Sequence, residues 1–433
     1  MKALAIRAAL LAAVMGTAFG GNWPNWRGPH FDGSTESGPL PAAPTRDDIV
    51  WSVALPGRGG ATPVVWEDHV FLNAPDASGN LVLVALDRRD GKERWRRTVG
   101  VGDKERGRNN MAASSPTTDG KAVFSLFGTG DLAAFDLDGR ELWKRNLGKD
   151  YGRFALMWIY GSSPVLHGDR LYVQVLQRNP MPADYLGFDG KQERESYVLC
   201  LDPRTGATIW RHVRKTDSTM ESSEAYSTPV PYHGANGDEL VVVGGDHVTG
   251  HRLSDGAENW RARLYEKRDD WYRIVTSPVT LPGLIFAGGP KGQPVVALRD
   301  GAKGDVTATG FAWRFAENPT DWATPLAMNG RLYVLDGGKR VLTKLDPKTG
   351  AKEWSGKLPG REVIWGSPTG ADGKIYQFSE DGTLSVCDAG AEFKLLGTLV
   401  FDGEGPCRGS VAVAHDQLFV KTGKKLHCIA VRK

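Results

Sequence analysis

The sequence predicts an all-β chain folded as an eight-bladed β-propeller of four-stranded antiparallel blades. Three observations support this prediction: a hairpin segment recurs, a small hydroxyl residue recurs upstream of each hairpin, and an alternating apolar segment lies between the two. Recurrence at a steady period fixes the architecture before any local detail does, because each repeat is a unit that buries its apolar face only against its neighbours.

The recurring hairpin is clearest in residues 200–210, CLDPRTGATIW, and residues 344–354, KLDPKTGAKEW. A third copy spans residues 85–95, and shorter copies span residues 134–143 and 251–260. In each, an apolar run ends in a residue that caps a turn, usually Asp, and a Gly follows that supplies the positive φ of a tight turn. A polar strand ending in Trp comes next, so the segment predicts a hairpin and not a helix.

The second marker is a Ser or Thr at the start of each repeat. These residues are Thr62, Ser115, Ser163, Thr228, Ser277, Thr324 and Ser367, each followed by Pro, and Ser410, which is followed by Val. Alternating segments such as residues 170–175 and 331–335 lie between marker and hairpin. Each unit therefore holds four short strands, which is the content of one propeller blade.

The ends of the chain are predicted to share the last blade. Residues 49–55 resemble a fourth strand without its three partners, and residues 410–431 hold three strands without a fourth. Pairing them closes the ring and removes free sheet edges. The predicted blades are residues 61–99, 114–148, 161–214, 226–265, 275–317, 322–358, 365–402, and 408–433 with the N-terminal strand. The structural Trp residues of the blades are Trp51, Trp95, Trp143, Trp210, Trp260, Trp313 and Trp354.

Residues 1–20 are predicted to be a secretory signal peptide, with a basic start, an apolar stretch and small residues at the exit. We therefore expect a periplasmic or secreted protein. The cleavage site has no Cys nearby to which a lipid could be attached, so we expect no lipid anchor there, and no later segment is long enough to span a membrane. Residues 21–48 are predicted to form an arm, rich in Trp and Pro, packed as a strap on the outside of the ring.

The charge of the chain excludes little, and its cysteine content argues against a metal or redox role for the thiols. Lys and Arg number 54 against 51 Asp and Glu, so the chain has no bulk basic field; we expect no nucleic-acid partner and a monomer. Cys200, Cys387, Cys407 and Cys428 form no CxxC, which argues against a metal site, while a single disulfide involving Cys407 stays open.

The Asp-x-x-Thr-Gly-x-x-x-Trp hairpin with Ser-Pro starts resembles the pyrroloquinoline-quinone-type (PQQ-like) repeat, over residues 49–433. That repeat occurs in quinoprotein alcohol dehydrogenases and in the cofactor-free lipoprotein propeller of the outer-membrane assembly machinery. Residues 23–29, WPNWRGP, followed by Asp32-Gly33, resemble the mature start of a group of secreted bacterial proteins with this repeat. The resemblance implies eight blades with Trp side chains docked between neighbours, and says little about chemistry.

In the dehydrogenases of this resemblance, the quinone lies between a vicinal disulfide and a Trp, and Ca²⁺ is held by Glu, Asn and Asp. This chain has no Cys-Cys pair. Its acidic and amide residues near the corresponding loops have no spacing that fixes a calcium shell: Asn109, Asn110, Glu221, Glu224, Asp269, Asp270 and Asp321. We therefore expect no cofactor and no metal, with PQQ and Ca²⁺ in a dehydrogenase as the alternative.

Aromatic and Arg residues gather in the loops that join blade to blade, which converge at one mouth of the channel. The candidate binding residues are Trp158, Tyr160, Tyr226, Trp271, Arg273, Trp322, Trp365 and Arg408. Such residues make binding hot spots, so the sequence predicts a non-catalytic scaffold that binds a protein or other macromolecule. The alternative is that the rings plug the channel as core; exposure of Trp158 and Trp365 decides between the two.

Two further loops are expected on the same face. Residues 100–111 form a basic, Gly-containing loop that is a candidate for an anionic ligand or acidic peptide, or is simply a solvated loop. Residues 177–195 are an insertion between the second and third strands of blade three, either a lid or contact loop or a tolerated surface excursion.

Overall fold

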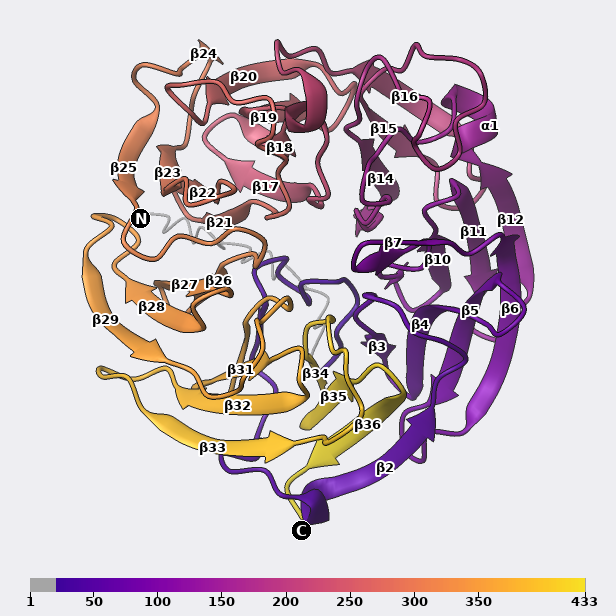
Figure 1. Cartoon of the computed structure of the whole chain (residues 1–433), viewed down its shortest axis with the longest axis vertical. Helices are drawn as coiled ribbons and strands as arrows, with labels where there is room; N and C mark the ends of the chain where they lie inside the picture. Colours follow the sequence, from indigo (N-terminus) through magenta and orange to yellow (C-terminus); the bar gives the residue numbers. More distant parts are fainter. Residues whose placement is uncertain (1–20, 433) are drawn as a thin grey trace, which may run out of the picture.

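The computed structural model describes residues 21–432 and confirms the eight-bladed β-propeller. In Figure 1 the blades follow one another around a central axis in chain order, with the first strand of each innermost and the fourth outermost. Within these residues the helical elements are α1 (Leu147–Tyr151) and two 3-10 turns, Arg46–Asp48 and Met220–Ser223. The predicted signal peptide, residues 1–20, lies outside the described residues.

The first four blades are antiparallel sheets whose strands pair in sequence order. Blade one is β3 (Val64–Trp66), β4 (His69–Pro75), β5 (Asn80–Asp87) and β6 (Glu93–Val101), and blade two is β9 (Thr117–Thr118), β10 (Ala122–Leu126), β11 (Asp131–Asp136) and β12 (Glu141–Asn146). Blade three is β13 (Val165–His167), β14 (Arg170–Val175), β15 (Tyr197–Leu201) and β16 (Thr208–Val213). Blade four is β17 (Val230–Gly234), β18 (Gly237–Gly244), β19 (His247–Arg252) and β20 (Glu258–Arg263), with β24 (Gly304–Asp305) parallel along its outer edge.

The last four blades repeat the pattern, and the eighth joins the two ends of the chain. Blade five is β21 (Val279–Leu281), β22 (Leu284–Ala287), β23 (Val295–Arg299) and β25 (Phe311–Phe315), and blade six is β26 (Leu326–Met328), β27 (Arg331–Asp336), β28 (Val341–Leu345) and β29 (Lys352–Lys357). Blade seven is β30 (Thr369–Ala371), β31 (Lys374–Phe378), β32 (Thr383–Asp388) and β33 (Leu395–Val400), and blade eight is β34 (Ala412–Ala414), β35 (Gln417–Lys421), β36 (Lys425–Ala430) and β2 (Ile49–Ala54). β2 lies antiparallel beside β36, indigo against yellow in Figure 1, so closure of the ring by the N-terminal strand is confirmed.

The blade Trp residues dock each blade on the next one. The indole N–H of each donates to a carbonyl in the third-to-fourth-strand turn of the following blade: Trp51 to Arg88, Trp95 to Leu137, Trp143 to Pro203, Trp210 to Leu253, Trp313 to Pro347 and Trp354 to Gly390. In the turns that receive Trp51, Trp95, Trp143, Trp210 and Trp313, the turn Gly also lies against the ring. Gly206, at φ 71°, is one example: a Cβ there would lie 2.6 Å from the Trp143 ring. The repeat therefore needs Gly for close approach as well as for positive φ.

Trp260 departs from this docking scheme. Its indole N–H donates to the Glu239 carboxylate of its own blade, at 3.0 Å, and only 2% of the residue is exposed. The turn that should receive it, after β23, lacks the usual repeat sequence, and β24 instead adds to the edge of β20 beside Trp260.

In blade seven, Gly397 stands at the register position of the blade Trp, opposite Val386, and Ala43 of the arm lies against it. Phe393 lies in the turn before β33 and packs edge-on against Trp354 of blade six, with ring centroids 5.7 Å apart.

The arm does not strap the outside of the ring, so that expectation is wrong. Trp23 is fully buried and pairs with Val65 of β3, an innermost strand. The Arg27 guanidinium is buried and donates to the carbonyls of Pro325 and Pro368, at the starts of blades six and seven. β1 (Ser34–Thr35) then pairs in parallel with β30. Figure 1 shows the indigo arm crossing the middle of the ring. The arm thus crosses the channel, at the end where the first and second strands of the blades are joined.

The four cysteines are free thiols and all are buried, so the structure contains no disulfide at Cys407. Burial raises the pKa of each thiol to about 12, which keeps them protonated and unreactive. Within residues 21–432 no helix has the length and apolar character needed to cross a membrane.

Candidate binding site at the channel mouth

A closed ring of hydrogen bonds surrounds the channel. The backbone N–H of each Ser or Thr marker donates to the side-chain hydroxyl of the next one, in the order Thr62, Ser115, Ser163, Thr228, Ser277, Thr324, Ser367, Ser410 and back to Thr62, at 2.7 to 3.1 Å. The residue before each Pro, or before Val411 in the last repeat, therefore has one role in all eight blades. It fixes the spacing of the innermost strands.

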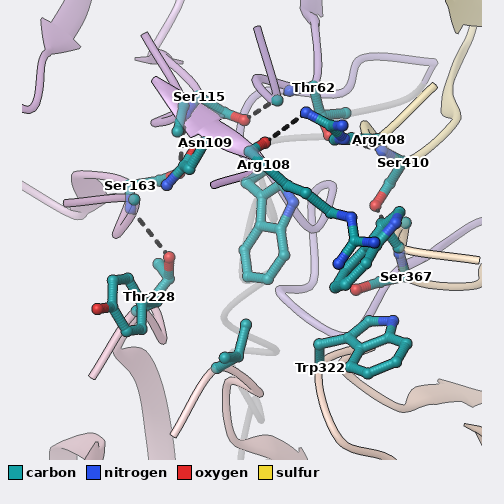
Figure 2. A pocket seen from close by; sticks show the side chains of 18 of the residues that line it. Thr62, Arg108, Asn109, Ser115, Ser163, Thr228, Trp322, Ser367, Arg408 and Ser410 are labelled. Atoms are coloured by element: carbon teal, nitrogen blue, oxygen red, sulfur yellow. Dashed lines mark hydrogen bonds between the residues drawn. The ribbon is translucent and has the colours of Figure 1, made fainter. Parts of the chain in front are cut away.

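A cavity of about 380 Å³ opens above this ring at the mouth of the channel. Its aromatic lining residues are Trp26, Trp158, Tyr226, Trp322 and Trp365; its charged ones are Arg108, Arg273 and Arg408; and six ring hydroxyls, of Thr62, Ser115, Ser163, Thr228, Ser367 and Ser410, complete the polar wall. Figure 2 shows these hydroxyls arranged around the cavity. The described lining contains three cations and no carboxylate.

Two carboxylates behind the wall hold four of the aromatic and charged lining residues in place. Glu221 accepts the indole N–H of Trp158 at 2.7 Å and lies 3.6 Å from the Arg273 guanidinium. Glu380 has the equivalent role for Trp365 and Arg408, in the loops before blades seven and eight.

Glu380 accepts the indole N–H of Trp365 at 2.9 Å and pairs with Arg408 at 2.9 Å. Trp365 in turn stacks on Trp322 with ring centroids 4.4 Å apart and an interplanar angle of 29°. Each acid thus fixes one ring and one guanidinium, and the charge of both arginines is already balanced.

A small hairpin reaches over the mouth. We call residues 102–110 the flap; it contains β7 (Glu105–Arg106) and β8 (Asn109–Asn110). The Arg106 guanidinium lies 3.6 Å from the Asp184 carboxylate of the insertion. The carbonyl of Arg108 accepts a hydrogen bond from Arg408 at 2.6 Å, and the Arg108 guanidinium lies 4.9 Å from the centre of the Trp365 ring. The flap therefore contacts the insertion of blade three at one side and Arg408, at the start of blade eight, at the other; Figure 2 shows the contact of Arg108 with Arg408.

The insertion, residues 177–195, is anchored beside the cavity by a buried acid. The Tyr185 hydroxyl donates to Glu224 at 2.5 Å, and the hydroxyl of Tyr226, a lining residue, donates to the same carboxylate at 2.8 Å. A backbone N–H, that of Met157, also donates to it. Burial nevertheless raises the pKa of Glu224 to about 7, because desolvation outweighs these hydrogen bonds.

The predicted binding residues divide into three groups. Trp158, Tyr226, Arg273, Trp322, Trp365 and Arg408 are brought together around the cavity. Trp271 lies outside the lining, on the rim, and is 47% exposed. Tyr160 does not reach the mouth: it is 1% exposed, and its hydroxyl donates to the Gln174 carbonyl inside blade three. We remove Tyr160 from the candidate set.

The exposure of two rings bears on the alternative that the aromatic residues merely plug the channel. Trp158 is 37% exposed and Trp365 is partly exposed, so neither ring is fully buried in the core.

The sequence did not indicate two of the aromatic and charged lining residues. Trp26 enters from the arm, whose path across the channel has no signal in the local sequence, and it forms the floor of the cavity. Arg108 lies in the basic loop that the sequence marks only as a segment.

The described residues lack two features that the resemblance implies for the quinone and Ca²⁺ of the dehydrogenases, an acidic metal cluster and a vicinal disulfide. Within residues 21–432, no three His, Cys, Asp or Glu side chains are placed to hold a metal. Glu221 and Glu380 approach the mouth, but each is committed to a Trp and an Arg. No cysteine pair is adjacent in the chain. We derive no redox step for this site.

Comparison with solved structures reveals two kinds of similar propeller. A quinohemoprotein alcohol dehydrogenase from Comamonas testosteroni is 13% identical with a TM-score of 0.70, over 95% of this chain and 81% of that one. BamB from Moraxella catarrhalis is 13% identical with a TM-score of 0.61, over 88% and 99%. A europium-containing methanol dehydrogenase is 12% identical with a TM-score of 0.67, over 95% and 98%. At this identity the likeness concerns the fold alone.

Sequence comparison gives the family. No curated protein sequence matches the chain. The family described as "Outer membrane protein assembly factor BamB", one of PQQ-like repeats, matches residues 42–186, 194–307 and 302–392. These matches cover most of the propeller, and the chain therefore belongs to this PQQ-like repeat family.

Proposed function

We propose that the chain is a non-catalytic scaffold that binds a protein partner through the loop face around the channel mouth. The supporting observation is that exposed apolar side chains continue from the cavity onto its rim. Trp158 lines the cavity, while Met220, 37% exposed, and Trp271, 47% exposed, lie outside it. A ligand confined to the cavity would leave these two side chains in water, whereas a protein surface would cover all three.

The three rim residues are held close together by their supporting loops. Glu221, the neighbour of Met220, accepts the Trp158 indole N–H at 2.7 Å. The N–H of Ser222 donates to the carbonyl of Asp270, which precedes Trp271, at 2.9 Å. Because a closed ring holds these loops in place, binding there loses little conformational entropy.

The location we propose is the periplasm or the cell exterior, on the basis of the signal peptide predicted in residues 1–20. The family is described by the name of an outer-membrane assembly factor, a description consistent with a protein partner and no cofactor.

Mutations on the rim provide the test. The protein would be used as bait, the partner it retains identified, and the dissociation constant measured between purified proteins. We expect Met220→Ala with Trp271→Ala, both outside the cavity lining, to weaken binding by about 30-fold or more, the size of a hot-spot loss.

The matched control replaces Leu142 and Ile209 by Ala, two apolar residues 41% and 42% exposed on outer strands. An equal loss in the control pair, or no loss in the rim pair, would contradict the proposal.

A quinone-dependent dehydrogenase is the second candidate, favoured by the stacked pair Trp322 and Trp365 with the Arg108 guanidinium above it. Titration with PQQ and Ca²⁺, followed by quenching of Trp fluorescence and by dye reduction on adding alcohols, separates the two. Saturable micromolar quenching with dye reduction would replace the scaffold by the enzyme. No quenching at high micromolar quinone is the result expected of the scaffold.

A further inference from the structure

The cavity contains one arginine whose charge is not balanced. Arg273 and Arg408 face Glu221 and Glu380. The Arg108 guanidinium, within residues 21–432, has no carboxylate within salt-bridge distance and makes no hydrogen bond; its contact is the face of Trp365 at 4.9 Å. Since the lining has no acid of its own, the cavity presents one uncompensated positive charge among aromatic rings.

The hydroxyl ring adds donors to the same cavity. Each of its eight oxygens accepts one backbone N–H. Among the described residues none of these hydroxyls has an acceptor for its own O–H. Six of them line the cavity together with Arg108 and the aromatic rings. A cavity wall made of O–H donors and a guanidinium suits an acceptor-only ligand group, and an ionised carboxylate is such a group.

The apolar part of the cavity limits what carries this carboxylate. Trp26 forms the floor, and the stacked pair Trp322 and Trp365 forms one wall. A flat or apolar side chain placed there loses water-exposed surface, and the volume of about 380 Å³ is at the lower end for small ligands. The site therefore has room for one ring with its attached charge, and not for an extended chain.

We propose that the cavity receives an aromatic residue of the partner protein together with one carboxylate beside it, and that Arg108 is the counter-ion of that carboxylate. This inference rests on the proposed function and names the chemistry of the segment inserted at its centre. Charge complementarity is the reason for choosing an acidic segment: one unbalanced cation, no competing acid in the lining, and six free hydroxyl donors. The carboxylate belongs either to the C-terminus of the partner or to an Asp or Glu side chain next to the ring.

Blocked amino acids test the inference without knowing the partner. Binding to the purified protein would be measured by calorimetry for N-acetyl-phenylalanine, which has the ring and the carboxylate, and for N-acetyl-phenylalaninamide, which has the ring alone. We expect the acid to bind at least about tenfold more tightly at low salt, as a charge-assisted pair should. A third probe, N-acetyl-aspartyl-phenylalaninamide, carries its charge on a side chain. Its binding relative to the acid tells the two sources of carboxylate apart.

Variants assign the preference to one side chain. Arg108→Gln is expected to reduce the acid-over-amide ratio to below about threefold, while Arg108→Lys keeps most of it because the charge remains. Arg361→Gln is the matched control, since Arg361 is exposed on the same face and outside the cavity lining. The inference is overturned if acid and amide bind equally, if neither binds at millimolar concentration, or if Arg108→Gln leaves the ratio unchanged.

The result of the blocked-amino-acid experiment can be distinguished from the result of the test of the scaffold proposal. The rim variants at Met220 and Trp271, which lie outside the cavity lining, report on partner binding, and the acid-over-amide ratio reports on the cavity. Loss of partner binding in the rim variants with no acid preference would leave a protein-binding face whose cavity is not used. An acid preference without effect of the rim variants would indicate a site for a free small carboxylate.

Discussion

At the scale of single residues, the turn glycines of the repeat do more than permit a turn. Gly206 has φ 71° and lies against the face of Trp143, the blade Trp of the preceding repeat. The indole N–H of Trp143 then donates to the Pro203 carbonyl of the same turn at 2.8 Å. One turn therefore satisfies the polar end of the indole and covers its apolar face, so two consecutive blades are joined by one ring.

This gives a prediction that separates backbone strain from steric clash. Gly206→Ala should destabilise the fold more than Gly79→Ala does, because both glycines have positive φ but only a Cβ at Gly206 meets a ring, at 2.6 Å. At Gly79, φ 76°, nothing lies within 4 Å of the added Cβ. We expect a loss of about 1 kcal/mol at Gly79 from φ alone and a further 1–3 kcal/mol, roughly, at Gly206 from the clash. Urea unfolding measures both, and equal losses would show that the Trp143 ring accommodates the added Cβ without cost, contrary to the expected clash.

At the scale of elements, the repeated hairpins were predictable and the unique segments were not. Strand positions follow from the period-2 pattern and from turn chemistry, and both recur in every blade, as in residues 200–210 and 344–354. The arm has no repeat partner, and its route across the channel depends on Arg27 meeting carbonyls of blades six and seven, about 300 residues away in sequence. For that reason, the position of Trp26 at the floor of the site could not be predicted from the sequence.

The same limit applies to the two loops of the mouth. The sequence marks the flap as basic and the insertion as long, yet it gives no reason to place Arg106 beside Asp184 or Tyr185 against Glu224. Such contacts join loops from different blades, and only the closed ring brings those loops together. Tyr160 is the converse case: it has the composition of a mouth residue, but its hydroxyl finds a carbonyl acceptor within its own blade.

The anchor of the insertion should make stability depend on pH. The pKa of Glu224 is raised from 4.5 to about 7. The folded state therefore keeps a proton that the unfolded chain releases as the pH rises above about 4.5. On account of Glu224 the free energy of unfolding falls between pH 4.5 and about 7, by at most about 3 kcal/mol.

Glu224→Gln removes this dependence and isolates it from other groups, such as Asp246, whose pKa burial also raises to about 7. The difference in unfolding free energy between the wild type and the variant should decrease from pH 5 to pH 7.5. Glu362→Gln, at an exposed position, is the control and should show a constant difference. A constant difference for Glu224→Gln as well would mean that the buried carboxyl is ionised throughout this range.

At the scale of the whole molecule, closure depends on a single strand donated by the other end of the chain. β2 forms the outer strand of blade eight, and Trp51, 8% exposed, donates to the Arg88 carbonyl of blade one. Its ring also receives Gly91 of the same turn. β2 thus contributes the outer strand of blade eight and the indole that joins blade eight to blade one. Both contacts that close the ring therefore depend on this one strand.

Deleting residues 49–55 should therefore open the ring instead of trimming its edge. The deletion exposes β36, whose unpaired backbone groups invite association with another chain, and it removes the Trp51 ring from its buried site, a loss of roughly 3–5 kcal/mol. We expect a lower melting temperature and concentration-dependent oligomers in light scattering. The control removes residues 431–433; the two of these that the structure describes, 431 and 432, follow β36 and pair with no strand. If the deleted protein keeps the melting temperature of the parent and stays monomeric, the seven remaining complete blades hold the ring without the strand, and closure by β2 is not what stabilises it.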